Sequence, residues 1–280
     1  MPDVATLLAR LGAIATQRLD RHRGTHRVAF CESALGANLE LDGSTWSTSV
    51  RERDLTEKPS ATEASREVRI RFRCVKGALP RATVSVCIDL PWSRDAYLCI
   101  PGAVYAGNRF AARRCVYPPM FNEADCRPDL PTIITDVPRL EFGEGESRID
   151  LLAADATAPA IGVVRPDGLA MWVSVEPLTR LGQVSLHVEE SAARDRLRLR
   201  LCAPGLREDY DYEGGNTTRT SLDRPADFVA GDEVELVLRI LVWDQADVSG
   251  LLRRWPDMLL ANAELGDHPG QWLGLQKPAG

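Results

Sequence analysis

The residues best suited to chemistry gather in one short stretch, DLPWSRDAYLCIPGAVYAGNRF, at positions 89–110. The candidate binding residues within it are Trp92, Asp95, Tyr105, Asn108 and Arg109. The two aromatic rings offer flat apolar faces, and the three polar side chains offer directional hydrogen bonds. Sugar recognition needs this mixture, because a sugar presents C–H patches and a rim of hydroxyl groups. The prolines and glycines among these residues equally fit a sharp structural turn, so both interpretations stay open.

Other chemistry-bearing residues carry weaker signals. No nucleophile elbow, phosphate-binding loop, dinucleotide glycine fingerprint or His-Glu-x-x-His motif occurs in the sequence. His187 stands on the polar side of a predicted strand, where a surface or cross-strand role is expected more often than that of a catalytic base. The acidic stretch at 207–220 is expected to be solvated, and a metal site at His22 and His26 is not favoured. We therefore expect no metal and no cofactor.

Charge and cysteine usage narrow the class of protein. The chain has 280 residues with 40 acidic and 34 basic side chains, a net charge of −6 that argues against a nucleic-acid-binding protein. The arginine stripes at 69–73 and 196–200 are expected to pair with acids across strands. Seven cysteines without a Cys-x-x-Cys pair, no signal peptide and no apolar run of membrane length predict a cytoplasmic protein with no membrane partner.

The elements that must position these residues are mostly strands. Apolar residues alternate with polar ones in six runs, at 68–74, 83–90, 171–175, 184–189, 196–202 and 234–243, and each run predicts a strand with one buried face. The last run is apolar on both faces and should lie in the middle of a sheet or under a covering layer. The polar stretch 44–65 is predicted to be a long loop.

Helical spacing appears only near the two ends. Residues 3–20 place leucines at helical intervals after Asp3, which predicts an N-terminal amphipathic helix. The stretch at 247–266 predicts a short linker helix interrupted at Pro256. The predicted fold is mainly β, a large antiparallel β-supersandwich, with a helix and its exit at 1–27, the sandwich at 28–248, and a linker helix and tail at 249–280.

Several segments resemble a known group of proteins. WSRDAYLCIPGAVYAGNRF, PTIITDVPRLEF, IDLLAADATAPAIGVVRP and LRLCAPGLREDYDY occur in an order similar to that of the N-terminal β-supersandwich domain of multidomain bacterial glycoside-hydrolase-like proteins. In that group a galactose-mutarotase-like sandwich precedes an (α/α)6 toroid, and FVAGDEVELVLRILVWDQADVSGLLRRWPDMLL is similar to the end of such a domain running into its linker helix. The resemblance covers about residues 28–260.

The resemblance implies a carbohydrate-active context without a reaction centre in this chain. The catalytic acid and its partner would be expected in the helical toroid, which these 280 residues do not contain. The implied role is a non-catalytic accessory module that docks on the toroid and shapes its substrate cleft through the five residues of the 89–110 stretch. One alternative is a mutarotase-like sugar epimerase using His187 with Glu189 or Glu176, and another is a structural or oligomerisation sandwich.

Overall fold

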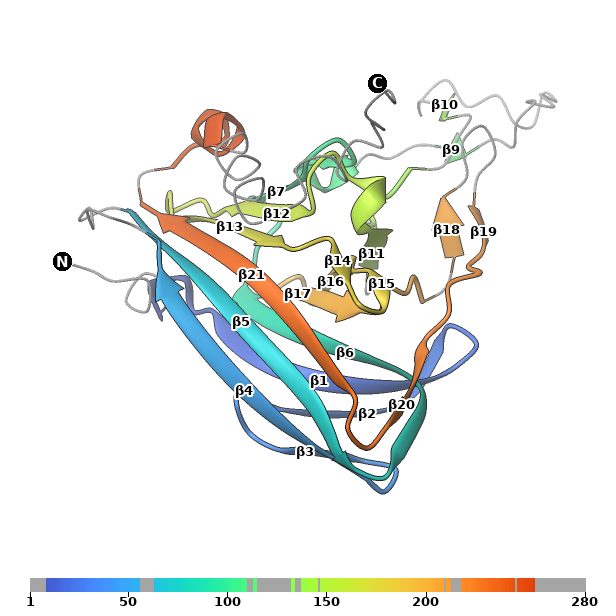
Figure 1. Ribbon diagram of the computed structural model, residues 1–280. Helices are drawn as coiled ribbons and strands as arrows, with labels where there is room; N and C mark the ends of the chain where they lie inside the picture. Colours follow the sequence, from blue (N-terminus) through green and yellow to red (C-terminus); the bar gives the residue numbers. More distant parts are fainter. Residues whose placement is uncertain are drawn as a thin grey trace, which may run out of the picture.

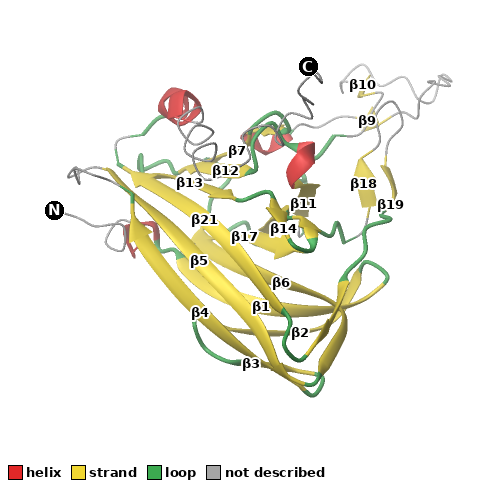
Figure 2. Ribbon diagram, in the orientation of Figure 1, coloured by secondary structure: helices red, strands yellow, loops and turns green. Residues whose placement is uncertain are grey.

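Two antiparallel β-sheets make up most of the protein (Figure 1). The computed structural model describes residues 9–55, 63–109, 113–114, 132–133, 137–145, 147–208, 210–212, 218–244 and 246–254. Figure 2 shows that strands dominate this part of the chain and that the helical segments are short. The predicted mainly β, antiparallel sandwich is confirmed.

Sheet A has seven strands. Their order is β11 (Ser147–Leu152), β16 (Ser185–Glu190), β17 (Arg196–Ala203), β6 (Ala78–Pro91), β1 (Ile14–Arg23) and β2 (His26–Ala34), with β20 (Ala226–Val229) also paired to β6. Every pairing within it is antiparallel. Strands far apart in the sequence are therefore neighbours, which lets residues from both halves of the chain meet on one sheet face.

Sheet B has eight strands. Their order is β3 (Leu39–Leu41), β4 (Ser44–Asp54), β5 (Glu63–Lys76), β21 (Glu233–Trp243), β13 (Ala170–Val175), β12 (Ala160–Val164), β7 (Tyr97–Ile100) and β8 (Val104–Tyr105). Strand β21 lies between β5 and β13, as its two apolar faces predicted. One of these faces adds to the core between the sheets, and the other lies under the C-terminal helical segment with Trp243.

Shorter elements connect the sheets. They are the β9 (Arg113–Arg114) and β10 (Thr132–Ile133) pair, β14 (Leu178–Thr179) with β15 (Gly182–Gln183), β18 (Tyr210–Tyr212) with β19 (Thr218–Thr220), and the 3-10 turns η1 (Ala106–Asn108) and η3 (Ala153–Asp155). Residues 248–254 are helical, and Leu251 packs beside Trp172 and Trp243. The expected interruption at Pro256 lies outside the described residues.

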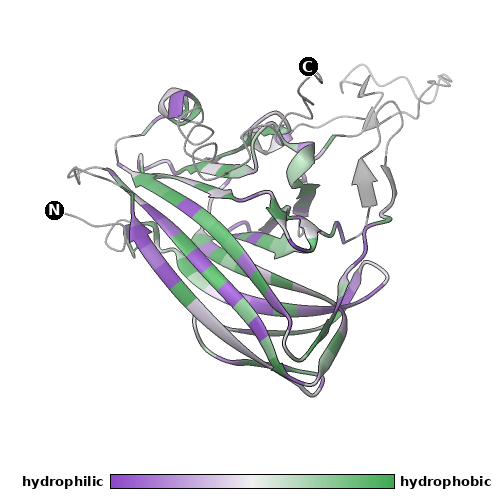
Figure 3. Ribbon diagram, viewed as in Figure 1, coloured by the Kyte–Doolittle hydropathy of each residue, from purple (hydrophilic) through white to green (hydrophobic). Residues whose placement is uncertain are grey.

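The core forms where the apolar faces of the two sheets meet. The predicted inward residues are buried there, including Phe72 of β5, Val86 of β6, Leu186 of β16 and Leu199 of β17. Figure 3 shows hydrophilic and hydrophobic positions alternating along the long strands. Since side chains alternate between the faces of a strand, the opposite face of sheet A carries polar residues, and we call it the polar face of sheet A.

The N-terminal helix expected over residues 3–20 is wrong from Ile14 onward. Only residues 9–11 are helical among those described there, and β1 runs through the middle of sheet A from Ile14 to Arg23. Leu19 faces the core, but Ile14 is 64% exposed, so the two do not share one buried stripe. The pairing of β1 with β2 and β6 satisfies its backbone groups, and the sandwich therefore begins before residue 28.

The long loop predicted at 44–65 is also largely wrong. Residues 44–54 form β4, which pairs with β3 and β5, and β5 begins at Glu63. Trp46 is fully buried in this strand against the edge of Phe228, with 5.1 Å between the ring centroids. Partners from β3, β5 and β20 override the low apolar content of the stretch, because they supply both the backbone hydrogen bonds and the packing.

Candidate functional site

Within the candidate stretch, residues 100–108 fold into a sharp corner at the edge of sheet B. Gly102 adopts φ +81°, and a Cβ there would lie 2.0 Å from Thr157 Oγ1, so the close approach requires glycine. Ala106, Gly107 and Asn108 follow in the left-handed region, with φ of 52°, 67° and 50°. The predicted corner is present, and its backbone conformation is held by local hydrogen bonds.

Asn108 and Tyr105 act within this corner. Asn108 Oδ1 accepts the Tyr105 N–H at 3.0 Å, and its Nδ2 donates to Ala103 O at 2.9 Å and to Pro138 O at 2.8 Å. Tyr105 Oη accepts the Gly102 N–H at 3.0 Å, while its side chain remains 48% exposed. Asn108 is thus occupied in holding the turn, and Tyr105 retains an exposed ring.

Trp92 and Arg109 meet on a residue that the sequence analysis did not single out. Trp92 Nε1 donates to Glu190 Oε1 at 2.6 Å, and Arg109 binds both carboxylate oxygens of Glu190. Ser147 and Arg194 also contact Oε2, at 2.9 and 2.7 Å. Burial raises the pKa of Glu190, but the hydrogen bonds from Arg109 and Trp92 outweigh burial and keep the pKa below its ordinary value.

The fifth predicted residue stands apart. Asp95 is exposed, and its backbone N–H donates to Ser93 Oγ at 3.2 Å. Among the described residues its carboxylate has no ion pair. The structure thus brings Trp92 and Arg109 together, joins Asn108 to Tyr105 in one turn, and leaves Asp95 on the surface. A binding role for the five stays a prediction.

A second polar cluster lies on the polar face of sheet A. Its centre is the fully buried His187, whose Nδ1 lies 2.6 Å from Asp150 Oδ1 and whose Nε2 lies 2.8 Å from Ser185 Oγ. Burial and Arg200 each lower the pKa of His187, but the charge of Asp150 and its hydrogen bond raise it to about 10. The cross-strand role expected for His187 is confirmed, and the surface position is not.

Arg200 ties this cluster together. Its guanidinium donates to Glu189 Oε1 at 3.0 Å and to Glu208 Oε1 at 2.5 Å, and lies 3.6 Å from Asp20 Oδ2. Burial raises the pKa of Glu208, yet Arg200, His187 and Arg27 lower it to about 2. Glu208 belongs to the stretch expected to be solvated, and its burial corrects that expectation: its N–H donates to Asp150 Oδ2 at 3.1 Å.

Most arginines of the two stripes pair with acids across strands, as expected, and among the described residues Arg196 is the exception. Arg71 of β5 contacts Glu235 of β21 at 3.2 Å on sheet B. On sheet A, Arg198 donates to both carboxylate oxygens of Asp89, at 2.8 and 2.7 Å, and to both of Glu32, at 2.8 and 3.0 Å.

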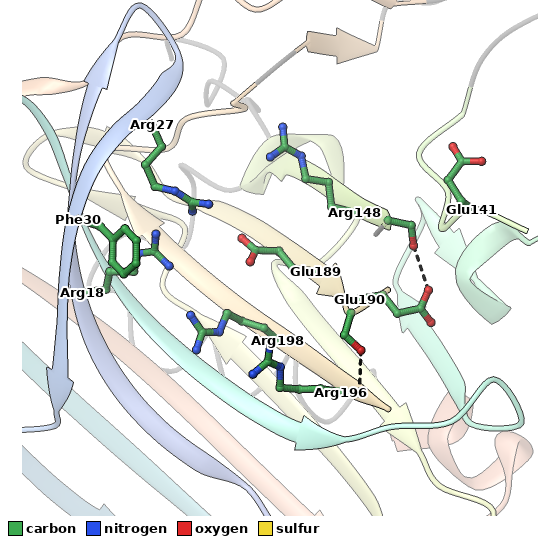
Figure 4. A pocket seen from close by; sticks show the side chains of 11 residues that line it. Arg18, Arg27, Phe30, Glu141, Arg148, Glu189, Glu190, Arg196 and Arg198 are labelled. Carbon is green, nitrogen blue, oxygen red and sulfur yellow. Dashed lines mark hydrogen bonds between the residues drawn. The ribbon is translucent and has the colours of Figure 1, made fainter. Parts of the chain in front are cut away.

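A cavity of about 560 Å³ lies over the polar face of sheet A. Its lining consists of Phe30, Ser147, Ser191, three glutamates (Glu141, Glu189 and Glu190) and five arginines (Arg18, Arg27, Arg148, Arg196 and Arg198). Apart from Glu141 and Ser191, these residues come from strands at both edges of the sheet, β2 and β11, and from β1, β16 and β17 between them. Figure 4 shows the charged ends of Arg27 and Glu189 directed toward each other across it.

Phe30 supplies the aromatic surface of this cavity. Its side chain is 56% exposed, the Arg18 guanidinium stacks 4.0 Å from the ring centroid, and that of Arg27 lies at 5.9 Å. The sequence analysis missed Phe30, although its place in the run HRVAFCESA, with Glu32 next to it on the same strand face, was visible. What could not be seen is that β2 pairs with β1 and faces the same way as the arginines of β17.

The described residues were compared with the arrangements that a metal ion or a membrane span requires. No group of three or more His, Cys, Asp and Glu side chains in the described ranges is arranged to hold a metal ion. No helix within those ranges is long and apolar enough to cross a bilayer.

The comparisons with known proteins found remote structural likenesses only. Neither a protein-family model nor a curated protein matches the chain. Among solved structures, a putative aldose 1-epimerase from Escherichia coli K12 has a TM-score of 0.32 and 11% identity, covering 76% of this chain and 68% of that one. Ligand-free α-N-acetylgalactosaminidase NagBb from Bifidobacterium bifidum has a TM-score of 0.33 and 10% identity, covering 89% and 38%. The chain thus spans about two thirds of the length of the first protein and well under half of the second. Because these TM-scores are too low to support a functional argument, the functional proposal rests on this chain's own residues.

Proposed function

We propose that the chain is a non-catalytic carbohydrate-binding β-supersandwich module, with the glycan held in the cavity over the polar face of sheet A. The observation that carries this proposal is the exposed Phe30 ring beside charged donors and acceptors in a cavity of about 560 Å³. Cavities of roughly 300–1,000 Å³ are typical of small-molecule sites. The ring matches the C–H face of a sugar, and the arginines and glutamates match its hydroxyl groups.

The burial of His187 supports a binding role over an enzymatic one. An epimerase of the mutarotase type would need an accessible acid and base, but His187 is 0% exposed and both its ring nitrogens are engaged. Glu189 shares its strand face, whereas the Glu176 N–H donates to Val237 O of β21. Burial raises the pKa of Glu176, and the charge of Arg69 on β5 opposes that rise. The second carboxylate thus belongs with sheet B, away from His187.

The docking role of the corner is the second half of the proposal. A helical-toroid catalytic domain, in a longer chain or as a separate partner, would contact the exposed Tyr105 ring and the Asp95 carboxylate. Tyr105 stands on the surface of a corner whose backbone is already fixed by Asn108 and Gly102, so little ordering entropy would be lost when its ring is docked. The sugar site and the docking surface would be two separate places on the module.

A sugar titration tests the binding half. Calorimetric titration with mono- and oligosaccharides should show binding that weakens about tenfold in Phe30→Ala, because the aromatic platform is lost. Leu178→Ala is the matched control, since Leu178 is similarly exposed at 51% on the β14–β15 hairpin. If no sugar binds, or if both variants bind as the wild type does, the cavity is not a glycan site. Anomerase activity that rises and falls with pH, as acid–base catalysis requires, would instead support an enzyme.

A further inference from the structure

Two arginines that line the cavity each have one buried guanidinium nitrogen without an acceptor among the described residues. Arg18 is 3% exposed and its Nε donates to Asp20 Oδ1 at 2.7 Å, yet its Nη2 has no hydrogen-bond acceptor among the described residues. Arg27 Nη1 is likewise buried without one, and the carboxylate oxygen paired with it, Glu208 Oε1, lies 3.6 Å away. A buried charged donor left without an acceptor is costly, so these atoms are suited to an incoming oxygen.

A third arginine faces the same space with its guanidinium unengaged. Arg196 is exposed on β17 and lines the cavity, and within the described part of the chain no carboxylate pairs with it. Arg198, two residues along the same strand face, is already held by Asp89 and Glu32. Figure 4 shows the charged ends of Arg196 and Arg198 lying side by side. Available positive charge is therefore concentrated at Arg18, Arg27 and Arg196.

The carboxylates that line the cavity are more fully occupied. Both oxygens of Glu190 bind Arg109, and Glu189 Oε1 accepts from Arg200 at 3.0 Å. Glu141 alone lies exposed at the rim. Most of the acidic groups are thus neutralised by arginines that do not line the cavity, while several of the lining arginines lack a full set of acceptors.

We infer that the cavity selects sugars that carry an acidic group, which Arg27, Arg196 and the Nη2 of Arg18 hold beside the Phe30 ring. This inference rests on the proposed carbohydrate binding and adds the chemical class of the ligand. A planar guanidinium fork matches a carboxylate or a phosphate with two parallel hydrogen bonds, and a charged acceptor strengthens each bond relative to a hydroxyl group.

Glucuronate and its neutral isostere glucuronamide test the inference directly. We expect the purified protein to bind glucuronate at least about tenfold more tightly than glucuronamide, because only the acid forms charge-assisted bonds. Added salt should weaken the first affinity and leave the second nearly unchanged. Galacturonate and glucose 6-phosphate, titrated in parallel, show whether a carboxylate or a phosphate is the preferred acidic group, and preference for either supports the inference.

Variants assign the effect to named side chains. Arg196→Gln and Arg27→Gln should each reduce the affinity for glucuronate toward that for glucuronamide, and Arg196, being exposed, can change without loss of the fold. Arg71→Gln on sheet B is the matched control, since Arg71 is a strand arginine of similar exposure that pairs with Glu235, and it should have no effect.

Different results would overturn the acidic-sugar inference and the proposed carbohydrate binding. Equal affinity for glucuronate and glucuronamide overturns the acidic-sugar inference and leaves carbohydrate binding intact. Preference for the acid that survives in both cavity variants also overturns it, because the acidic group would then be held elsewhere. Absence of binding to every sugar in the panel removes both proposals.

Discussion

His187 and Asp150 sit opposite each other on β16 and β11, with 2.6 Å between Nδ1 and Oδ1, and neither side chain is more than 7% exposed. The pair lies under the 206–208 segment, which donates the Leu206 N–H to Ser185 Oγ at 3.1 Å. A histidine with this strand position could have served as a general acid. Its burial makes it a cross-strand brace that supports the floor of the cavity.

The free energy of unfolding at alkaline pH should depend on the His187–Asp150 pair. His187 has a folded pKa of about 10 against an ordinary value of 6.5, so its contribution is complete below pH 6.5 and is lost as the pH rises toward 10. His187→Gln should lower the free energy of unfolding by about 3 kcal/mol at pH 6, since it leaves a buried carboxylate with one partner fewer. Urea denaturation should show this difference shrinking between pH 6.5 and 10. The exposed His26→Gln variant is the control, and a pH-independent difference would contradict the assignment.

Ionisation of Glu208 should contribute to the loss of stability at acidic pH. Its folded pKa of about 2 lies below the ordinary 4.5, so its contribution is present above pH 4.5 and is lost as the pH falls toward 2. We expect Glu208→Gln to cost about 3 kcal/mol at pH 7, because Arg200 and Arg27 lose a buried partner. The gap from the wild type should close on acidification. Glu233→Gln, in an exposed pair with Arg73, should change stability by less than about 0.5 kcal/mol.

The corner at 102–109 should depend on Asn108 more than on its exposed neighbours. Asn108→Ala removes three hydrogen bonds and places alanine at φ 50°, so we expect a loss of about 2–4 kcal/mol in thermal or urea unfolding. Asp95→Ala, at an exposed position, should stay within about 0.5 kcal/mol of the wild type. If the two variants are equally stable, the turn is not held by this amide.

A close contact within sheet B gives a packing test. A Cβ on Gly162 of β12 would lie 2.6–2.8 Å from three ring atoms of Trp172 on β13, so Gly162→Ala should destabilise the fold by about 1–3 kcal/mol. Gly143→Ala is the control, because a Cβ there meets nothing within 4 Å, and it should be neutral or slightly stabilising. A Gly162→Ala protein as stable as the wild type would show that the tryptophan ring can move aside.

The period-2 alternation determined most of the sandwich. Apart from Val184, the six predicted runs lie in strands, with Ile70 of β5 and Leu199 of β17 fully buried as their positions required. Alternation is a local property of a half-buried strand, so it can be read from a short window. The helix predicted near the N-terminus was wrong because it also rested on a local pattern. A few leucines satisfy the helical period whether or not the chain pairs as a strand.

Tertiary structure alone decided where the polar side chains meet. The binding side chains predicted at 89–110 were chosen because they are adjacent in sequence, but Glu190, which joins Trp92 to Arg109, comes from a strand 81 residues after Arg109. The cavity likewise combines Phe30 of β2 with Arg148 of β11, at opposite edges of sheet A. Strand order and register set these distances, and they depend on pairing between segments that no local pattern specifies. The sequence by itself thus determined six of the strands and their apolar faces, while the pairing of all the strands decided which charges are buried together and which remain open to a ligand.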